Sequence, residues 1–221
     1  MKQHRTTKNI CIILSFYLAF SISAIAQNSS QAEALLNEVS TKIKSYNNVS
    51  IDFKYALNNQ GENINQETRG TVVIEGEKYV LNILGATRIF DGKTLYTISP
   101  DDEEVTISSS DAEDEGTITP NKMLSFYTEG YRYTMDIVQN VMGRKIQYVK
   151  LTPIDSKSDI SSVLLGIDVN TKHIHNLIEV GKNGTRTTLT INSFKTNESL
   201  PKNQFSFDQV KYKDYYINKI D

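Results

Sequence analysis

The sequence has 221 residues, a formal net charge of −2 and one cysteine, Cys11. A chain of this length can bury one sizeable core, and a single cysteine cannot close an internal disulfide, so a disulfide scaffold is excluded. The near-neutral charge disfavours nucleic acid as a partner, because phosphate binding needs a basic surface.

Residues 1–26 have the pattern of a cleaved signal peptide. Three basic residues precede an apolar run from Ile10 to Ile22, and Ala24-Ile25-Ala26 fits the small-x-small cleavage rule. The apolar run is shorter than the roughly 20 residues of a membrane span, although an uncleaved anchor is the alternative. Because Cys11 lies well before the cleavage site, it is a poor candidate for lipid attachment. We expect a soluble exported protein.

The chain that remains after Ala26 would have 195 residues and no cysteine. The leader carries three Lys/Arg and no Asp/Glu, so the remainder keeps 21 basic against 26 acidic residues, a formal charge of −5. The absence of cysteine excludes thiol chemistry and cysteine metal sites. We expect a single domain over residues 27–221.

The first predicted element is an amphipathic helix. Ser30 to Glu33 fits a capping box, with Ser30 as the cap. Apolar residues then follow at spacings of three and four, from Leu36 to Tyr46, before Asn47-Asn48 ends the pattern. Such a helix is expected to pack on a sheet.

Alternation of apolar and polar residues then predicts one large antiparallel sheet. Asp91-Gly92 and Asn183-Gly184 are strong hairpin turns, because such turns need positive φ. The expected strands are Val49 to Leu57, Thr71 to Glu75, Lys78 to Leu84, Ile89-Phe90, Thr94 to Ile98, Tyr131 to Val138, Ile146 to Thr152, Val163 to Val169, Ile174 to Val180 and Arg186 to Ile191. The tail after Tyr212 is polar and is expected to be loose.

The stretch from Asp101 to Glu115 holds eight acidic residues and no basic one. Val105 to Ile107 inside it is a candidate short strand. Calcium binding is the alternative to a solvated loop, but the Asp-x-Asp-x-Asp-Gly spacing of a calcium loop is absent. We therefore expect a solvated loop here and no metal.

Thr119-Pro120 opens a short apolar segment with helical spacing, Asn121 to Thr128, because proline favours the first turn of a helix. A strongly twisted sheet of this many strands tends to curl. Its concave apolar face would be too large for its own side chains to fill, so a small helix can cover it. This arrangement is typical of a container for an apolar ligand.

No motif for catalysis is present. His173 and His175 share a strand face and could bind a metal together, but the sequence shows no third ligand, so they are interpreted as polar positions on a solvent-facing strand. There is no Gly-x-Ser-x-Gly, His-Glu-x-x-His or phosphate-binding glycine loop. We expect neither enzyme activity nor a cofactor.

These segments, in this order, resemble the periplasmic outer-membrane lipoprotein carrier (LolA) family over nearly all of residues 27–221. The Asp-Gly-Lys-Thr-Leu-aromatic hairpin is the most specific motif. The matching stretches are Lys44-Ser45-Tyr46, Val49 to Tyr55, Gly70 to Ile74 with Lys78-Tyr79, Phe90 to Tyr96, Pro120 with Met123-Leu124, Leu151-Thr152-Pro153, Gly184 and Phe205-Ser206-Phe207.

The resemblance implies an α+β, mainly β fold: an incomplete, half-open antiparallel β-barrel with a small helical lid over an apolar cavity. It also implies a monomeric periplasmic carrier that shields the acyl chains of lipoproteins. Such a carrier takes them from an inner-membrane lipoprotein-releasing ABC transporter to the outer membrane, where the sequence does not identify the acceptor. The candidate residues for cavity wall and lid are Phe53, Tyr79, Leu81, Tyr96, Met123, Leu124 and Phe126.

One departure from the family pattern concerns release of the cargo. The family commonly has a basic-Pro turn whose arginine is linked to lid closure, whereas this chain has Glu75-Gly76-Glu77 there. Arg69, Lys78 and Arg88 are the basic residues that could take its place, but none of them matches the position of that turn.

Three alternative functions remain. A carrier of another lipid or glycolipid would need the same cavity. An envelope-stress sensor of the same fold would bind a regulatory membrane protein, but it would need a second domain for which we expect no room in this chain. A hydrolase is the least favoured.

Overall fold

The computed structural model describes residues 28–109 and 119–220. The expected leader, residues 1–26, therefore lies outside the described residues. Within the described part, no helix is both long and apolar enough to cross a membrane.

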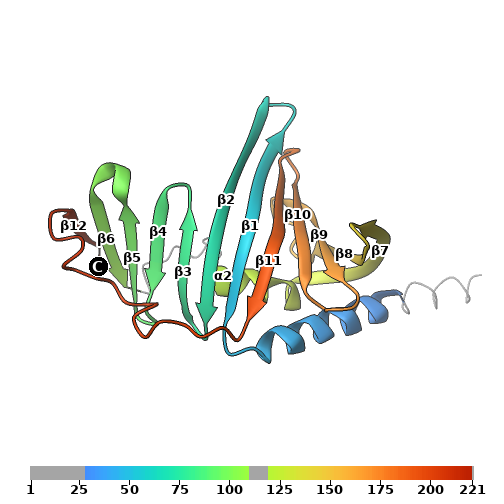
Figure 1. Ribbon diagram of the computed structural model, residues 1–221. Helices are drawn as coiled ribbons and strands as arrows, with labels where there is room; N and C mark the ends of the chain where they lie inside the picture. Colours follow the sequence, from blue (N-terminus) through green and yellow to red (C-terminus); the bar gives the residue numbers. More distant parts are fainter. Residues whose placement is uncertain (1–27, 110–118, 221) are drawn as a thin grey trace, which may run out of the picture.

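Twelve strands form one continuous sheet (Figure 1). Its spatial order is β12-β6-β5-β4-β3-β2-β1-β11-β10-β9-β8-β7. The strands are β1 (Val49–Asn59), β2 (Ile64–Glu75), β3 (Lys78–Ile83), β4 (Ala86–Phe90), β5 (Thr94–Ser99), β6 (Glu104–Ser109), β7 (Tyr131–Val141), β8 (Arg144–Pro153), β9 (Ile160–Asp168), β10 (Ile174–Gly181), β11 (Arg186–Thr196) and β12 (Tyr216–Ile220).

Every neighbouring pair is antiparallel except β12 and β6, which run parallel. The sheet is not closed into a barrel, because β7 and β12 are its two edge strands and do not pair with each other. The predicted fold, a mainly β, half-open antiparallel barrel with few helices, is confirmed.

The N-terminal helix (residues 28–44) runs along one end of strands β8 to β10 (Figure 1). Its Leu36 and Val39 are buried in the core, as the spacing predicts, and so is Ala32 one turn earlier. The predicted capping box is wrong, because the chain is already helical at Asn28 and Ser30 lies inside the helix. The Asn28 side chain instead accepts a hydrogen bond from the backbone N–H of Met135 on edge strand β7 (2.6 Å).

The main core lies between this helix and one face of the sheet, which we name the concave face; the opposite face is named the convex face. Residues that face each other across an antiparallel pair lie on the same side of the sheet. The buried cluster joins the helix to alternate positions of β1, β2, β8 and β9, such as Ile51, Val72, Leu151 and Leu165.

The chain after Tyr212 is not loose, contrary to the sequence prediction. Tyr216–Ile220 forms β12, which pairs with β6 from Glu104 to Ser108. In Figure 1 the segment that leads to it runs from the foot of β11 along the lower ends of the central strands. The polar composition of this segment suggested a frayed tail. Composition does not show that β6 has an unpaired edge to which the segment can add as a strand.

Within the described residues, three short helical segments lie between β5 and β7. The 3-10 turn η1 (Pro100–Asp102) precedes β6, which confirms a strand inside the acidic stretch. Residues 110–118 of that stretch lie outside the described part. Helix α2 (Pro120–Met123) and the 3-10 turn η3 (Phe126–Thr128) confirm the predicted helical segment near Pro120.

Candidate ligand-binding site

An apolar cavity of about 180 Å³ lies between the concave face of the sheet and α2. All of its lining residues are apolar or aromatic. They are Ile51, Phe53, Tyr55, Val72, Ile74, Leu81, Ile83, Pro120, Met123, Leu124, Ile174, Leu177, Leu189 and Ile191. A space lined in this way suits hydrocarbon and offers almost no hydrogen bonds to a polar ligand.

The cavity wall is built from cross-strand rows on β1, β2 and β3. Ile51 pairs with Val72, which pairs with Leu81, so three apolar side chains stand side by side. In the next row, Phe53 pairs with Gly70. A Cβ at Gly70 would lie 2.5 Å from Phe53 Cζ, so only glycine lets the phenyl ring lie across β2.

The segment around α2 covers this wall like a lid. Thr119 Oγ1 accepts a hydrogen bond from the Lys122 backbone N–H (3.3 Å) and caps the helix, and Pro120 occupies its first turn. Two contacts attach the segment. The Asn121 side chain donates to the Glu77 carbonyl in the β2–β3 turn (2.8 Å), and Tyr127 is fully buried in the core.

Burial makes the phenol and carboxyl groups on this side of the sheet favour their neutral forms. It raises the pKa of Tyr127, whose hydroxyl has no hydrogen-bond partner within the described residues. Burial also raises the pKa of Glu179, two positions beyond the cavity residue Leu177. The pKa of Tyr131 is raised by burial and then by Glu179. The lining of the cavity itself contains no Asp, Glu, Lys, Arg or His side chain.

The structure brings four of the seven candidate site residues together around the cavity. Phe53 and Leu81 lie in its wall, and Met123 and Leu124 lie in the lid. These positions are geometric observations, and the role of the four residues in binding remains a prediction.

The other three candidate residues lie elsewhere. Tyr79 is buried against Phe90 beside the cavity, with ring centroids 5.6 Å apart. Phe126 packs edge-on to Tyr127. Tyr96 lies on the opposite face of the sheet, because its neighbour Leu95 is the residue that faces the core.

Sequence reasoning missed the far wall of the cavity. Ile174 and Leu177 on β10, and Leu189 and Ile191 on β11, all line it. The apolar alternation that predicted both strands was visible in the sequence. The sequence did not reveal that β11 pairs with β1. This pairing brings two strands that are far apart in the sequence together in the middle of the sheet.

The interpretation of the two histidines as solvent-facing is wrong for His175, which is 9% exposed and whose Nδ1 lies 3.3 Å from the guanidinium of Arg144. His173 is half-buried. His173 Nε2 lies 2.7 Å from the Tyr46 hydroxyl at the end of the N-terminal helix. Burial lowers the pKa of both histidines. Lys42 lowers the pKa of His173 further, Arg144 lowers that of His175 further, and Asp168 opposes both shifts.

In the parts of the chain that the structure describes, no group of three or more His, Cys, Asp or Glu residues could hold a metal ion. The Glu75-Gly76-Glu77 segment forms the predicted turn between β2 and β3, with Gly76 at positive φ.

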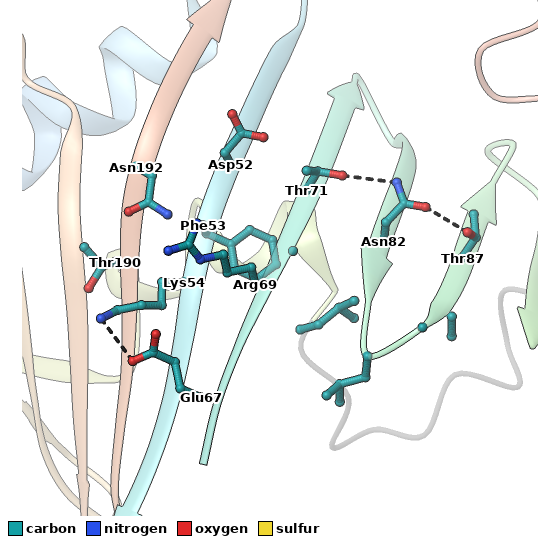
Figure 2. A pocket seen from close by; sticks show the side chains of 15 residues that line it. Asp52, Phe53, Lys54, Glu67, Arg69, Thr71, Asn82, Thr87, Thr190 and Asn192 are labelled. Carbon is teal, nitrogen blue, oxygen red and sulfur yellow. Dashed lines mark hydrogen bonds and ion pairs between the residues drawn. The ribbon is translucent and has the colours of Figure 1, made fainter. Parts of the chain in front are cut away.

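A second space lies on the convex side of the sheet. Figure 2 shows this polar hollow, about 930 Å³ and open to solvent, over β11, β1, β2 and the β3–β4 hairpin. Polar side chains such as Asp52, Arg69 and Asn192 line most of it. Lys54 and Glu67, on the neighbouring strands β1 and β2, form an ion pair within this space (3.2 Å). We name the whole space the outer hollow.

Comparison with known proteins identifies the family. The model of the outer membrane lipoprotein carrier protein LolA family matches residues 44–208, more than half of the chain. The chain belongs to this family, whose fold is a carrier or binding fold. No curated protein matches it significantly.

Two solved structures share this fold at low sequence identity, and a third is similar more distantly. An uncharacterized conserved protein from Thermus thermophilus is 10% identical, with a TM-score of 0.55 over 86% of this chain and 99% of that one. LprF from Mycobacterium bovis is 16% identical, with a TM-score of 0.51 over 79% and 97%. A LolA superfamily protein from Nitrosomonas europaea is 13% identical, with a TM-score of 0.41 over 80% and 97%.

Proposed function

We propose that this protein is an exported carrier that shields the acyl chains of lipoproteins and moves them from the inner to the outer membrane. The observation that carries the proposal is the wholly apolar cavity beneath a small lid. Family membership supports the same class of ligand.

Transfer energies explain why such a carrier needs a cavity. Each buried methylene is worth about 0.8 kcal/mol, so a chain of about a dozen methylenes carries roughly 10 kcal/mol. Acylated protein therefore crosses water only when apolar surface covers its chains. The carrier must also bind less tightly than its acceptor, which favours a cavity that opens over a rigid, fully complementary pocket.

The size of the cavity points to movement on binding. At about 180 Å³ it is smaller than the roughly 300–1,000 Å³ of typical small-molecule sites. Acyl chains would enter by displacing the lid, which is short and held by the Asn121–Glu77 hydrogen bond and by Tyr127. Met123 and Leu124 are only half-buried, so they can move without opening the core.

The remaining parts of the proposal follow the family. We expect cleavage of the leader after Ala26, a periplasmic location, a monomer without cofactor or enzyme activity, and loading by an inner-membrane lipoprotein-releasing ABC transporter. The outer-membrane acceptor is left open. The turn at Glu75 to Glu77 still links β2 to the lid through Asn121, although it has no arginine or proline.

Leu124→Asp tests the proposal. The variant should fold with a melting temperature within a few degrees of the parent but lose most binding of a fluorescent acyl probe, because the carboxylate would have to be desolvated against hydrocarbon. Lys122→Asp, on the exposed side of the same helix, is the matched control and should bind normally despite a larger change of charge.

Two outcomes would contradict the assignment of the site. If Leu124→Asp folds and binds the probe as well as the parent, α2 is not the lid of the binding site. If it does not fold, Leu124 belongs to the structural core.

A further inference from the structure

Strand β2 is longer than the strand beside it. β1 pairs with β2 along its length, from Asn59 opposite Ile64 to Val49 opposite Ile74. β3 pairs with β2 only from Gly70 to Glu75. Within the described residues, no strand pairs with the other edge of residues 64–69, although β1 holds that segment in an extended conformation. We name this segment the β2 edge.

The outer hollow lies against the β2 edge. Its lining includes Glu67, Arg69 and Gly70 from β2, and residues 82–87 of the β3–β4 hairpin. Figure 2 shows the tip of that hairpin ending beside β2 at the level where pairing stops. The two tip residues, Leu84 and Gly85, both have positive φ, and Leu84 is 77% exposed.

The outer hollow and the apolar cavity adjoin each other. Phe53 and Ile83 line both spaces, one from β1 and the other from the end of β3. The phenyl ring of Phe53 lies across Gly70, directly beyond the β2 edge. A ligand with an apolar end in the cavity could therefore continue past Phe53 into the outer hollow.

We infer that the β2 edge binds the polar, extended peptide next to the acylated residue of the cargo, as an added β-strand. The inference rests on the proposed function, because the acyl chains in the cavity bring the peptide to this edge. Backbone hydrogen bonds from residues 64–69 give the contact, so the sequence of the peptide matters little.

The side chains of the β2 edge fit a polar strand. Asn65, Glu67 and Arg69 point to one face of the sheet, and Gln66 and Thr68 to the other. Six residues at about 3.4 Å each give an edge of roughly 20 Å. Natural sheets usually protect a free edge with a proline, a bulge or a covering segment, and the β2 edge contains no proline and no break in its register with β1.

The occupant is a peptide and not a glycan for a geometric reason. An unpaired strand edge presents N–H and C=O groups at the spacing of another peptide backbone. A sugar chain cannot match that repeat over six residues. Tighter binding of a glycolipid would therefore contradict the inference, and the experiment includes a glycolipid for this reason.

The experiment compares two fluorescent triacylated peptides that carry the same polar linker of about eight residues. In one of them, every linker amide is N-methylated, which removes the donors on both edges of the linker and blocks strand addition. We expect the purified exported protein to bind the unmethylated peptide at least tenfold more tightly. Hydrogen exchange at those amides of residues 64–69 that point away from β1 should slow only when that peptide is bound.

A pair of insertion variants separates the edge from the cavity. Four residues inserted around Leu84-Gly85 would lengthen β3 and β4 along β2 and cover the edge. The same insertion around Met142-Gly143, a two-residue turn with positive φ at both positions on the β7–β8 hairpin, is the matched control. Only the first insertion should abolish the tenfold preference, and both variants should still bind a simple acyl probe.

Each result decides between the inferences. Equal affinity for the two peptides, or unchanged hydrogen exchange at residues 64–69, overturns strand addition and leaves the carrier function intact. A glycolipid with the same acyl chains that binds tighter than the unmethylated peptide also overturns it. Failure of the parent to bind any acyl probe overturns the proposed function itself. If the β3–β4 insertion does not fold, the methylation and exchange results decide alone.

Discussion

The two halves of the sheet use opposite faces for their apolar side chains. In the cavity half, around β1, β2 and β3, the apolar residues point to the concave face and leave a space beneath α2. In the half formed by β5, β6 and β12, Ile98 and Val105 are fully buried but lie outside the main core. They are opposite each other on the convex face, where Tyr96 stacks on Phe207 (4.7 Å).

This difference predicts that binding and stability can be changed separately within one continuous sheet. The C-terminal segment covers the apolar residues of the β5–β6 half, with Phe207 stacked on Tyr212 in turn (5.6 Å). In the cavity half, the four-residue helix α2 covers the apolar residues only in part and leaves the cavity beneath it. Substitutions in the β5–β6 half should therefore reduce stability without changing binding, and lid substitutions should do the reverse.

The largest expected effect is at Ile98. Ile98→Ala removes three carbons from a side chain that is 1% exposed, and buried isoleucine truncations cost about 2–5 kcal/mol. For a chain of this size we expect a fall in melting temperature of roughly 10 °C. Thermal unfolding followed by circular dichroism measures it. Acyl-probe affinity at 20 °C should stay within twofold, and a selective loss of binding would break the distinction between the two halves.

A smaller loss is expected at Gly70, on the boundary between cavity and outer hollow. In Gly70→Ala the new methyl would meet Phe53 Cζ at 2.5 Å and the Asn82 carbonyl oxygen at 2.7 Å. Overpacking of this kind costs about 1–3 kcal/mol. Unlike Ile98→Ala, this variant should also change acyl-probe affinity, because Phe53 must move. A variant with parental stability and affinity would show that the Phe53 ring is not held there.

Phe207 gives a third comparison. Phe207→Ala removes the stacking on Tyr96 and Tyr212, and we expect a loss of about 1–2 kcal/mol, because an aromatic pair adds about 0.5–1.5 kcal/mol beyond burial and this ring is only half-buried. Urea unfolding should show the loss with acyl binding unchanged. Phe205→Ala, on the same segment, is the control and should cost less. Equal losses would argue against a specific role for the stack.

The smallest effect concerns pH and His175. Its pKa lies below the ordinary value of about 6.5, so below that pH the unfolded chain binds a proton that the folded protein does not. The stability that neutral His175 contributes is present above about pH 6.5 and is lost as the pH falls through the folded pKa. His175→Gln should reduce the acid sensitivity of the melting temperature by less than about 4 °C. An unchanged pH profile would contradict this.

Much of the fold could be predicted from the sequence, because alternation and turn chemistry are local. The Asp91-Gly92 hairpin is an example: Asp91 Oδ1 accepts from the Thr94 backbone N–H (2.8 Å), and Gly92 has positive φ. Long-range pairing is not local. The contacts of β11 with β1 and of β12 with β6 depend on which edges meet in space.

The candidate site shows the same limit. Met123 and Leu124 could be placed near the cavity because a short apolar helix must cover something. Tyr96 could not, because strand periodicity gives two faces without saying which one is concave. A shift of one residue, from Leu95 to Tyr96, decides between core and convex surface.

We propose above all that the cavity beneath α2 holds the acyl chains of a lipoprotein. Native mass spectrometry of the protein, purified from the envelope without detergent, tests it most directly. The account predicts a bound species whose fragments include an acylated peptide, present on the parent and on Lys122→Asp but lost from folded Leu124→Asp. A parent that carries no acylated species, or a Leu124→Asp variant that carries as much of it as the parent, would contradict the claim.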